Sequence, residues 1–261
     1  MNIAQLMDLA DRLFYIDSSG YQNLISKQKE ILSIIKPATN IKNIDYKKIN
    51  KYVEYLKSKG NSPKTINDKL SYISTLLTYA LQNQLIDSKP YIPYCKVIQN
   101  KEKYFTEKEL IRCFNWTRIN KQKELQKIIL IGLYTGLRIH DILALTTDNI
   151  KNDSLYIYDS KVNRNYVIPI SHKLKYVLKD YKKISMNYNR CHYLFNKMKK
   201  ELKLDKRITI HTLRHTFCSR LIQKGIPIIV IQKLANHKSI KTTLRYAHLN
   251  TQQLKEAINI L

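Results

Sequence analysis

The sequence predicts a mainly α-helical protein with one small antiparallel β-sheet, arranged as a helical N-terminal domain and a mixed α/β C-terminal domain. Three observations support this fold class. Apolar residues recur at intervals of three and four through most of the chain, which is the helical period. Residues 154–170 instead show the alternation of paired strands. A polar stretch with two prolines at 87–104 separates two helical blocks, and 261 residues suffice for two modest domains.

Positive charge is spread over the whole chain. Lysine and arginine total 46 against 20 acidic residues, a formal net charge of +26. Nucleic acid is the partner that fits best, because its phosphates attract a basic surface at long range and counterion release then favours binding. An anionic membrane surface is the alternative. No run of about 18 apolar residues predicts a membrane span, so we expect a cytoplasmic, DNA-associated protein with no membrane partner.

The N-terminal domain, residues 1–86, is expected to hold four amphipathic helices. Apolar residues at helical spacing predict the first three at 3–14, 24–35 and 49–56. The fourth begins at Ser62, a natural N-cap followed by proline at the first helical position.

The polar side of that fourth helix carries a small basic and amide cluster, which we expect to contact DNA phosphates. A solvated helix face is an equally weighted alternative on charge alone. The residues of this cluster are Lys64, Asn67 and Lys69.

Residues 87–104 are the predicted linker, and the C-terminal domain is expected to span 105–250. Its first helix begins at Thr106, because Glu109 three residues later completes a capping box. An apolar helix follows at 125–134 and ends at a glycine.

Two strands are predicted at 154–158 and 166–170, with a polar hairpin tip at 161–165. Leu155 and Ile157 would share the buried face. The remaining helices are expected at 211–224, 227–234 and 239–246, followed by a short amphipathic tail helix at 251–261.

The stretch HTLRH places His211 and Arg214 on one face of a predicted helix start, beside unpaired backbone N–H groups that suit a phosphate. Taken alone, a solvated surface explains this stretch better. Four further side chains in the same half of the chain favour the phosphate site over the solvated surface. They are Arg138, Lys161, His237 and Tyr246.

Together these six side chains are the groups that a metal-free phosphoryl transfer requires. Guanidinium groups hold phosphate oxygens, imidazoles move protons, a lysine protonates a leaving oxygen and a tyrosine attacks. No paired carboxylates lie near them in the sequence, which disfavours a two-metal nuclease. The four cysteines show no CxxC spacing, so we expect reduced thiols, no zinc site and no other cofactor.

The C-terminal domain resembles the catalytic domain of the tyrosine recombinase (phage integrase) family of site-specific recombinases. Five sequence boxes agree with that family in order and spacing, and residues 1–86 resemble its helical core-binding domain. The boxes are TGLR with Arg138, YDSKVNRNYVIPI with Lys161, HTLRH with His211 and Arg214, LANH with His237, and TTLRYAHL with Tyr246.

The resemblance implies that Tyr246 attacks a DNA phosphodiester, forms a covalent 3′-phosphotyrosyl intermediate and frees a 5′-hydroxyl. Bond energy is conserved, so neither ATP nor a metal is needed. Arg138 and Arg214 would neutralise the phosphate. Lys161 would protonate the leaving 5′-oxygen, and His211 would assist proton transfer at Tyr246.

The resemblance also assigns supporting roles. His237 would hydrogen-bond the scissile phosphate, and Asp141 would support the arginines from where the family commonly has glutamate. Asn236 replaces a glycine that the family usually has, and we expect it to keep the positive φ of that turn, because asparagine tolerates it next best. Local packing or hydrogen bonding is expected for His215, Thr216 and His248.

The implied partner is double-stranded DNA with paired, inverted-repeat sites, held by a homotetramer. The tail at 251–261 would dock on a neighbouring subunit, with packing on its own subunit as the alternative. A non-catalytic DNA-binding protein is the competing function, but binding alone does not require Tyr246. A relaxing topoisomerase or telomere resolvase shares the chemistry, but usually has additional domains.

Overall fold

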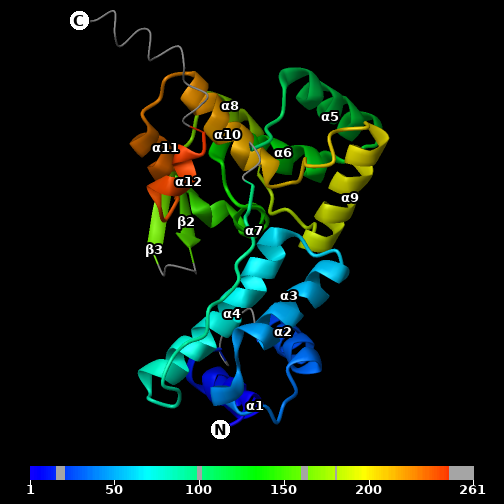
Figure 1. The fold of residues 1–261 in the computed structure, drawn as a ribbon. Helices are drawn as coiled ribbons and strands as arrows, with labels where there is room; N and C mark the ends of the chain where they lie inside the picture. Colours follow the sequence, from blue (N-terminus) through cyan, green and yellow to red (C-terminus); the bar gives the residue numbers. More distant parts are fainter. Residues whose placement is uncertain (16–20, 99–101, 160–163, 180, 247–261) are drawn as a thin grey trace, which may run out of the picture. The chain divides into compact units, whose positions relative to one another are not determined.

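The computed structural model describes residues 1–15, 21–98, 102–159, 164–179 and 181–246, and it divides into two compact units, Met1–Gln99 and Asn100–Leu261 (Figure 1). Each unit has its own cluster of buried hydrophobic side chains. The predicted fold class, mainly helical with a small antiparallel sheet, is confirmed. None of the described helices is long and apolar enough to cross a membrane.

The first unit contains the four helical segments that the sequence predicts. Ser62 caps the longest helix, because its hydroxyl accepts a hydrogen bond from the backbone N–H of Thr65 at 3.2 Å. Residues 88–98 have no regular secondary structure. The elements are α1 (Ile3–Ala10), the π-turn η1 (Asp11–Tyr15), α2 (Tyr21–Ile34), the 3₁₀ turn η2 (Ile41–Asn43), α3 (Tyr46–Ser58) and α4 (Pro63–Gln82).

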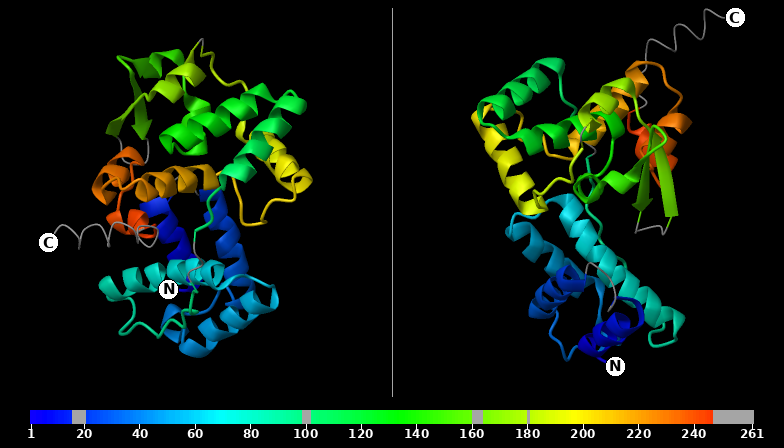
Figure 2. Two further views of the ribbon diagram at one scale, coloured as in Figure 1. Left: turned by 90° about the horizontal axis from the view of Figure 1, so that it is seen from above. Right: turned by 180° about the vertical axis from the view of Figure 1, so that it is seen from behind.

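Within its described residues, the second unit contains the strand pair and the helices that the sequence predicts up to residue 246, together with α7, α8, α9 and β1, which the sequence does not predict. Figure 2 shows its helices and small sheet from two further sides. The elements are α5 (Glu107–Ile119), α6 (Lys123–Thr135), α7 (Ile139–Ala144), η3 (Thr147–Asn149), β1 (Ile150–Lys151), β2 (Ser154–Asp159), β3 (Arg164–Pro169), α8 (His172–Leu178), α9 (Tyr188–Glu201), α10 (Thr212–Gln223), α11 (Ile228–Leu234) and α12 (Ile240–Leu244).

The starts and ends of the first two helices of this unit follow from local chemistry. Thr106 and Glu109 form the predicted capping box, with reciprocal side-chain to backbone hydrogen bonds at the start of α5. Helix α6 ends at Gly136, whose φ of 66° lies in the left-handed region. That turn reverses the chain directly before Arg138.

The sheet is antiparallel with the order β1-β2-β3. Burial alternates along β2, so that Leu155, Ile157 and Asp159 face the interior. The hairpin tip is shorter than the predicted 161–165, because the register extends to the pair Asp159 and Arg164.

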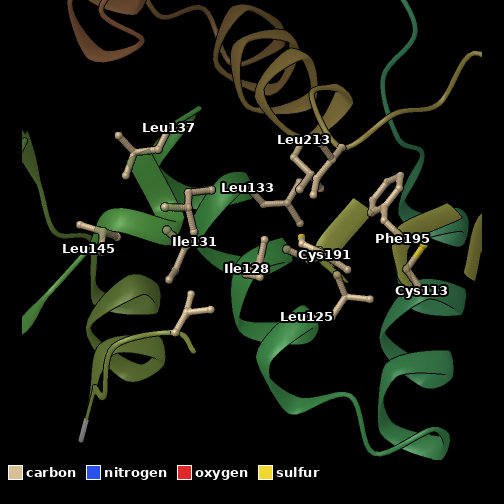
Figure 3. Packing of buried hydrophobic residues seen from close by; sticks show 14 of the residues in the cluster. Cys113, Leu125, Ile128, Ile131, Leu133, Leu137, Leu145, Cys191, Phe195 and Leu213 are labelled. Atoms are coloured by element: carbon tan, nitrogen blue, oxygen red, sulfur yellow. The ribbon is translucent and has the colours of Figure 1, made fainter. Parts of the chain in front are cut away.

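Helix α6 lies at the centre of the second core. Its buried side chains pack against those of α5, α9 and α10, among them Phe195 and Leu213 (Figure 3). Gly132 brings α10 close, since a Cβ there would lie 3.2 Å from that of Leu213. This contact fixes the start of α10, which carries His211 and Arg214.

Candidate active site

Arg214 is held at the start of α10 by two backbone carbonyl groups from other helices. The residue is 3% exposed, and its Nη1 donates to the carbonyl oxygen of Gly136 at 2.8 Å, while its Nη2 donates to that of Ala235. Gly136 follows α6 and Ala235 follows α11, so one guanidinium joins three helices. Because a guanidinium stays protonated in proteins, the site carries a buried positive charge.

Arg138 stands at the N-terminus of α7 and forms an ion pair with Asp159. Its Nη1 lies 3.4 Å from Oδ2 of this carboxylate, and Asp159 is only 7% exposed. The carboxylate holds the Arg138 guanidinium and offsets part of the charge of the two arginines. The sequence prediction missed Asp159, although its alternation with Leu155 and Ile157 in β2 placed it on the buried face.

Asp141, predicted to support the arginines, lies in the first turn of α7. Its Oδ2 is 3.5 Å from the hydroxyl of Tyr166 on β3. Burial raises the pKa of Asp141, and the charge of Arg138 acts in the opposite direction. The ion pair of Arg138 that the structure describes is with Asp159. Asp141 interacts with Arg138 electrostatically, through the charges of the two side chains.

His211, which is exposed at the start of α10, and His237, which is buried, both lie beside the arginines. Desolvation is the main cause that lowers the pKa of each to about 4, and Arg214 and Arg138 add to the effect. His237 follows α11, and its Nδ1 lies 2.8 Å from the hydroxyl of Thr243 on α12. Neutral rings of this kind are able to donate a hydrogen bond to a phosphate and to accept a proton.

Tyr246 lies in the same cluster, just after α12, and is 2% exposed. Its hydroxyl is in hydrogen-bond contact with Nδ1 of His215, and burial raises the pKa of the phenol. The ring of His211 contacts His215 edge-on at 4.9 Å. The structure therefore places His215, expected to have only a packing or local hydrogen-bonding role, between His211 and the tyrosine.

Asn236 has a φ of 48°, so the expected left-handed turn is confirmed. Its Nδ2 donates to Oδ2 of Asp159 at 2.8 Å. The side chain that replaces glycine thus links the turn after α11 to the end of β2.

Three predicted features lie outside the described residues. They are Lys161, His248 and the tail at 251–261.

The three DNA-binding residues predicted in the first unit differ in their surroundings. The amide of Asn67 makes two hydrogen bonds of 2.8 Å to the backbone of Cys95, and Nζ of Lys69 pairs with Glu30 at 2.5 Å. These hydrogen bonds and this ion pair connect residues within the first unit. Lys64 is exposed on the first turn of α4 and remains the accessible cation of the predicted set.

The positive charges of the arrangement suit the binding of an anion. Within the described ranges, no group of three His, Cys, Asp or Glu side chains is placed to hold a metal ion. A depression beside the site is bordered by β3 and the end of α11 and includes His237. Two guanidinium groups, three imidazoles and a buried phenol therefore lie together in the second unit, and His237 borders the depression.

Comparison with protein families gives two matches along the chain. The model of the phage integrase family matches residues 103–253, which is more than half of the chain. The phage integrase SAM-like domain matches residues 15–110.

Similar proteins of known activity cover nearly the whole chain. The TnP I resolvase of Bacillus thuringiensis is 27% identical over 270 residues, covering 93% of this chain and 87% of that protein. The tyrosine recombinase XerC of Pediococcus pentosaceus is 24% identical and covers 92% of this chain and 89% of its own length.

Solved structures share the fold. The Tn1549 transposon integrase in complex with circular intermediate DNA has a TM-score of 0.80 at 19% identity and covers 99% of both chains. A lambda integrase tetramer bound to a Holliday junction has a TM-score of 0.76 at 19% identity, covering 92% of this chain and 78% of that one.

Proposed function

The chain belongs to the phage integrase family, and from this premise we propose how its residues perform the family's reaction. It is a site-specific tyrosine recombinase that acts on DNA. The roles of the described residues are assigned from their contacts, burial and charges, and that of Lys161 from its sequence motif.

Tyr246 is the nucleophile of the proposal. Its Oη attacks the scissile phosphorus, forms a 3′-phosphotyrosyl bond and releases a 5′-hydroxyl. A phenol with an ordinary pKa of about 10 is a poor nucleophile at neutral pH, and burial raises the pKa of Tyr246 further. The reaction therefore needs a proton acceptor and nearby cations. The observation that carries the proposal is that buried Tyr246 has its hydroxyl in contact with His215 and lies within the electrostatic reach of Arg214.

Arg138 and Arg214 neutralise the phosphate in this scheme. The described carbonyl contacts of Arg214 use two of the five N–H donors that a guanidinium has, which leaves donors for phosphate oxygens. Asp159 holds Arg138 in place. Loss of one such donor typically slows a reaction by about a hundredfold or more.

The remaining groups handle hydrogen bonds and protons. We assign to His237 and His211 the role of neutral donors toward the phosphate, since desolvation and the charges of Arg214 and Arg138 lower the pKa of both rings. Lys161 is assigned the protonation of the leaving 5′-oxygen. This role rests on its position in the YDSKVNRNYVIPI box.

The proposed partner is double-stranded DNA in the cytoplasm, with paired inverted-repeat sites held by four subunits. The net charge of +26 supports DNA as the partner. The lambda integrase with this fold has been solved as a tetramer on a Holliday junction, which supports the four-subunit assembly. The segment 251–261 is proposed to dock on a neighbouring subunit.

The function is tested with a DNA site that carries a nick beside the cleavage position, so that the cleaved end diffuses away and the covalent intermediate accumulates. We expect a denaturation-resistant protein–DNA adduct with the wild-type protein and none with Tyr246→Phe. Tyr176→Phe is the matched control, because Tyr176 is 85% exposed. Equal adduct from wild type and Tyr246→Phe would contradict the proposed nucleophile.

A further inference from the structure

Glu102, His215 and Tyr246 form a continuous chain of contacts in the second unit. The hydroxyl of Tyr246 contacts Nδ1 of His215, and Nε2 of the same ring lies 3.5 Å from Oε2 of Glu102. We propose that His215, oriented by Glu102, accepts the Tyr246 proton during strand cleavage and returns it during rejoining. This inference rests on the proposed role of Tyr246 as nucleophile.

The geometry assigns the two ring nitrogens different tasks. A neutral imidazole has one N–H donor and one acceptor nitrogen, and the hydrogen bond at one nitrogen selects the tautomer. With the Nε2–H directed to Glu102, the lone pair of Nδ1 faces the Tyr246 hydroxyl. At 3.5 Å this is an ion-pair contact, which strengthens when the ring becomes charged.

Glu102 is itself fixed from two directions. Its second carboxylate oxygen, Oε1, lies 3.2 Å from Nη1 of Arg245, the residue before Tyr246. The backbone N–H of Phe105 donates to the hydroxyl of Thr216 at 2.9 Å, which anchors this segment beside α10. The carboxylate is therefore held in place before DNA binds.

His215 is better placed for this task than His211. The structure describes a ring contact of His211 with His215 but none with Tyr246. The carboxylate of Glu102 lies 3.5 Å from the ring of His215, and the described structure pairs no carboxylate with His211 in this way.

The groups facing His215 set the balance between its neutral and charged forms. Burial and the positive charges of Arg214 and Arg245 keep the ring neutral before the reaction, and Glu102 stabilises the imidazolium that forms. Among the described residues, the rings of His211 and Tyr246 also lie against His215.

The proposed step is balanced in bonds and protons. The Tyr246 Oη–P bond forms as the P–O5′ bond breaks, and the phenol proton moves to Nδ1 of His215. The leaving 5′-oxygen takes its proton from Lys161. On rejoining, an incoming 5′-hydroxyl gives its proton to Lys161 and forms the new P–O5′ bond, the P–Oη bond breaks, and His215 returns the proton to Tyr246.

The first test measures the single-turnover rate of adduct formation on the nicked site as a function of pH. At neutral pH we expect His215→Ala to lose about a hundredfold or more in rate. Its rate should rise about tenfold per pH unit into the alkaline range, as tyrosinate forms without a base, while the wild-type rate stays level. A structural defect would lower the rate equally at every pH.

Glu102 is a positioning residue, and its removal has a different signature. Because the carboxylate stabilises the imidazolium, Glu102→Gln lowers the pKa of His215, so the acid limb of the pH profile moves to lower pH and the plateau falls. Glu102→Asp should restore part of the plateau rate of adduct formation that Glu102→Gln loses. His192→Ala, which removes an exposed histidine on α9, should leave the profile unchanged.

The second test replaces the bridging 5′-oxygen at the cleavage position by sulfur, which leaves without a proton donor because a thiol is far more acidic than an alcohol. We expect this substrate to rescue Lys161→Ala but not His215→Ala. Rescue of His215→Ala, or a rate within threefold of wild type on the ordinary substrate, overturns the inference and leaves the proposed function intact. Adduct formation by Tyr246→Phe would instead refute the function itself.

Discussion

The side-chain amide of Asn236 donates a 2.8 Å hydrogen bond to Asp159, and the same carboxylate oxygen lies 3.4 Å from the guanidinium of Arg138. One buried carboxylate therefore joins the turn after α11, the end of β2 and the start of α7. These are the segments that carry His237 and Arg138, so their relative placement depends on Asp159.

We predict that Asp159→Ala destabilises the protein. The substitution leaves the buried amide of Asn236 without this acceptor, which typically costs about 1–3 kcal/mol. Urea denaturation followed by circular dichroism measures the free energy of unfolding. Asp148→Ala, at an exposed position of η3, is the control and should change it by less than about 0.5 kcal/mol. Equal losses in both variants would contradict this role.

Gly136→Ala is expected to be more harmful than Gly60→Ala. Both glycines have positive φ, 66° and 73°, so each substitution bears the cost of a left-handed alanine, about 1–2 kcal/mol. At Gly136 the new Cβ also overlaps the ring of Phe217, with Cε1 2.9 Å away, whereas no atom lies within 4 Å at Gly60. Overpacking adds about 1–3 kcal/mol, which chemical denaturation detects. Indistinguishable unfolding midpoints would refute the predicted overlap.

Stability should fall as the pH is lowered from about 6.5 to about 4. In the folded protein the pKa of His211 and of His237 is about 4, below the ordinary value of 6.5. The unfolded chain therefore binds more protons in this window, so acid favours unfolding. Unfolding midpoints should fall less steeply with acid in a His211→Gln, His237→Gln double variant than in wild type. If the unfolding midpoints of the two proteins depend on pH in the same way, the fold does not lower the pKa of these histidines.

DNA binding should weaken with salt, and the slope should distinguish Lys64 from Lys69. If exposed Lys64 contacts a phosphate, Lys64→Ala lowers the slope of log K against log salt concentration by about 0.9. Lys69 is paired with Glu30, so Lys69→Ala should change the slope less. Fluorescence anisotropy at several salt concentrations measures both slopes, and a larger change for Lys69→Ala would reverse the assignment.

Local patterns in the sequence predicted the helices with strong caps or clear apolar periods. The capping box at Thr106 and the N-cap at Ser62 are examples, because each depends only on neighbouring residues. Helix α7 has six residues, too few for a period to be recognised. In α9 the buried positions Cys191, Leu194 and Met198 have helical spacing, but many polar residues between them obscured the pattern.

The site was predictable only as a set of reactive side chains. Arg138, Arg214 and Tyr246 are identified by their motifs, but the motifs do not show which groups touch. The contacts of Asp159 with Arg138, and of Glu102 with His215, join residues far apart in the sequence. Such pairs follow from tertiary packing, which no local period or spacing encodes.

The central claim, that Tyr246 becomes joined to DNA, is tested most directly by identifying the residue in the covalent adduct. Protein trapped on a nicked site is digested with trypsin and nuclease, and the nucleotide-bearing peptide is sequenced by mass spectrometry. We predict the nucleotide on the tryptic peptide 246–255, in which Tyr246 is the sole tyrosine. A nucleotide on any of the other 18 of the 19 tyrosines would contradict it.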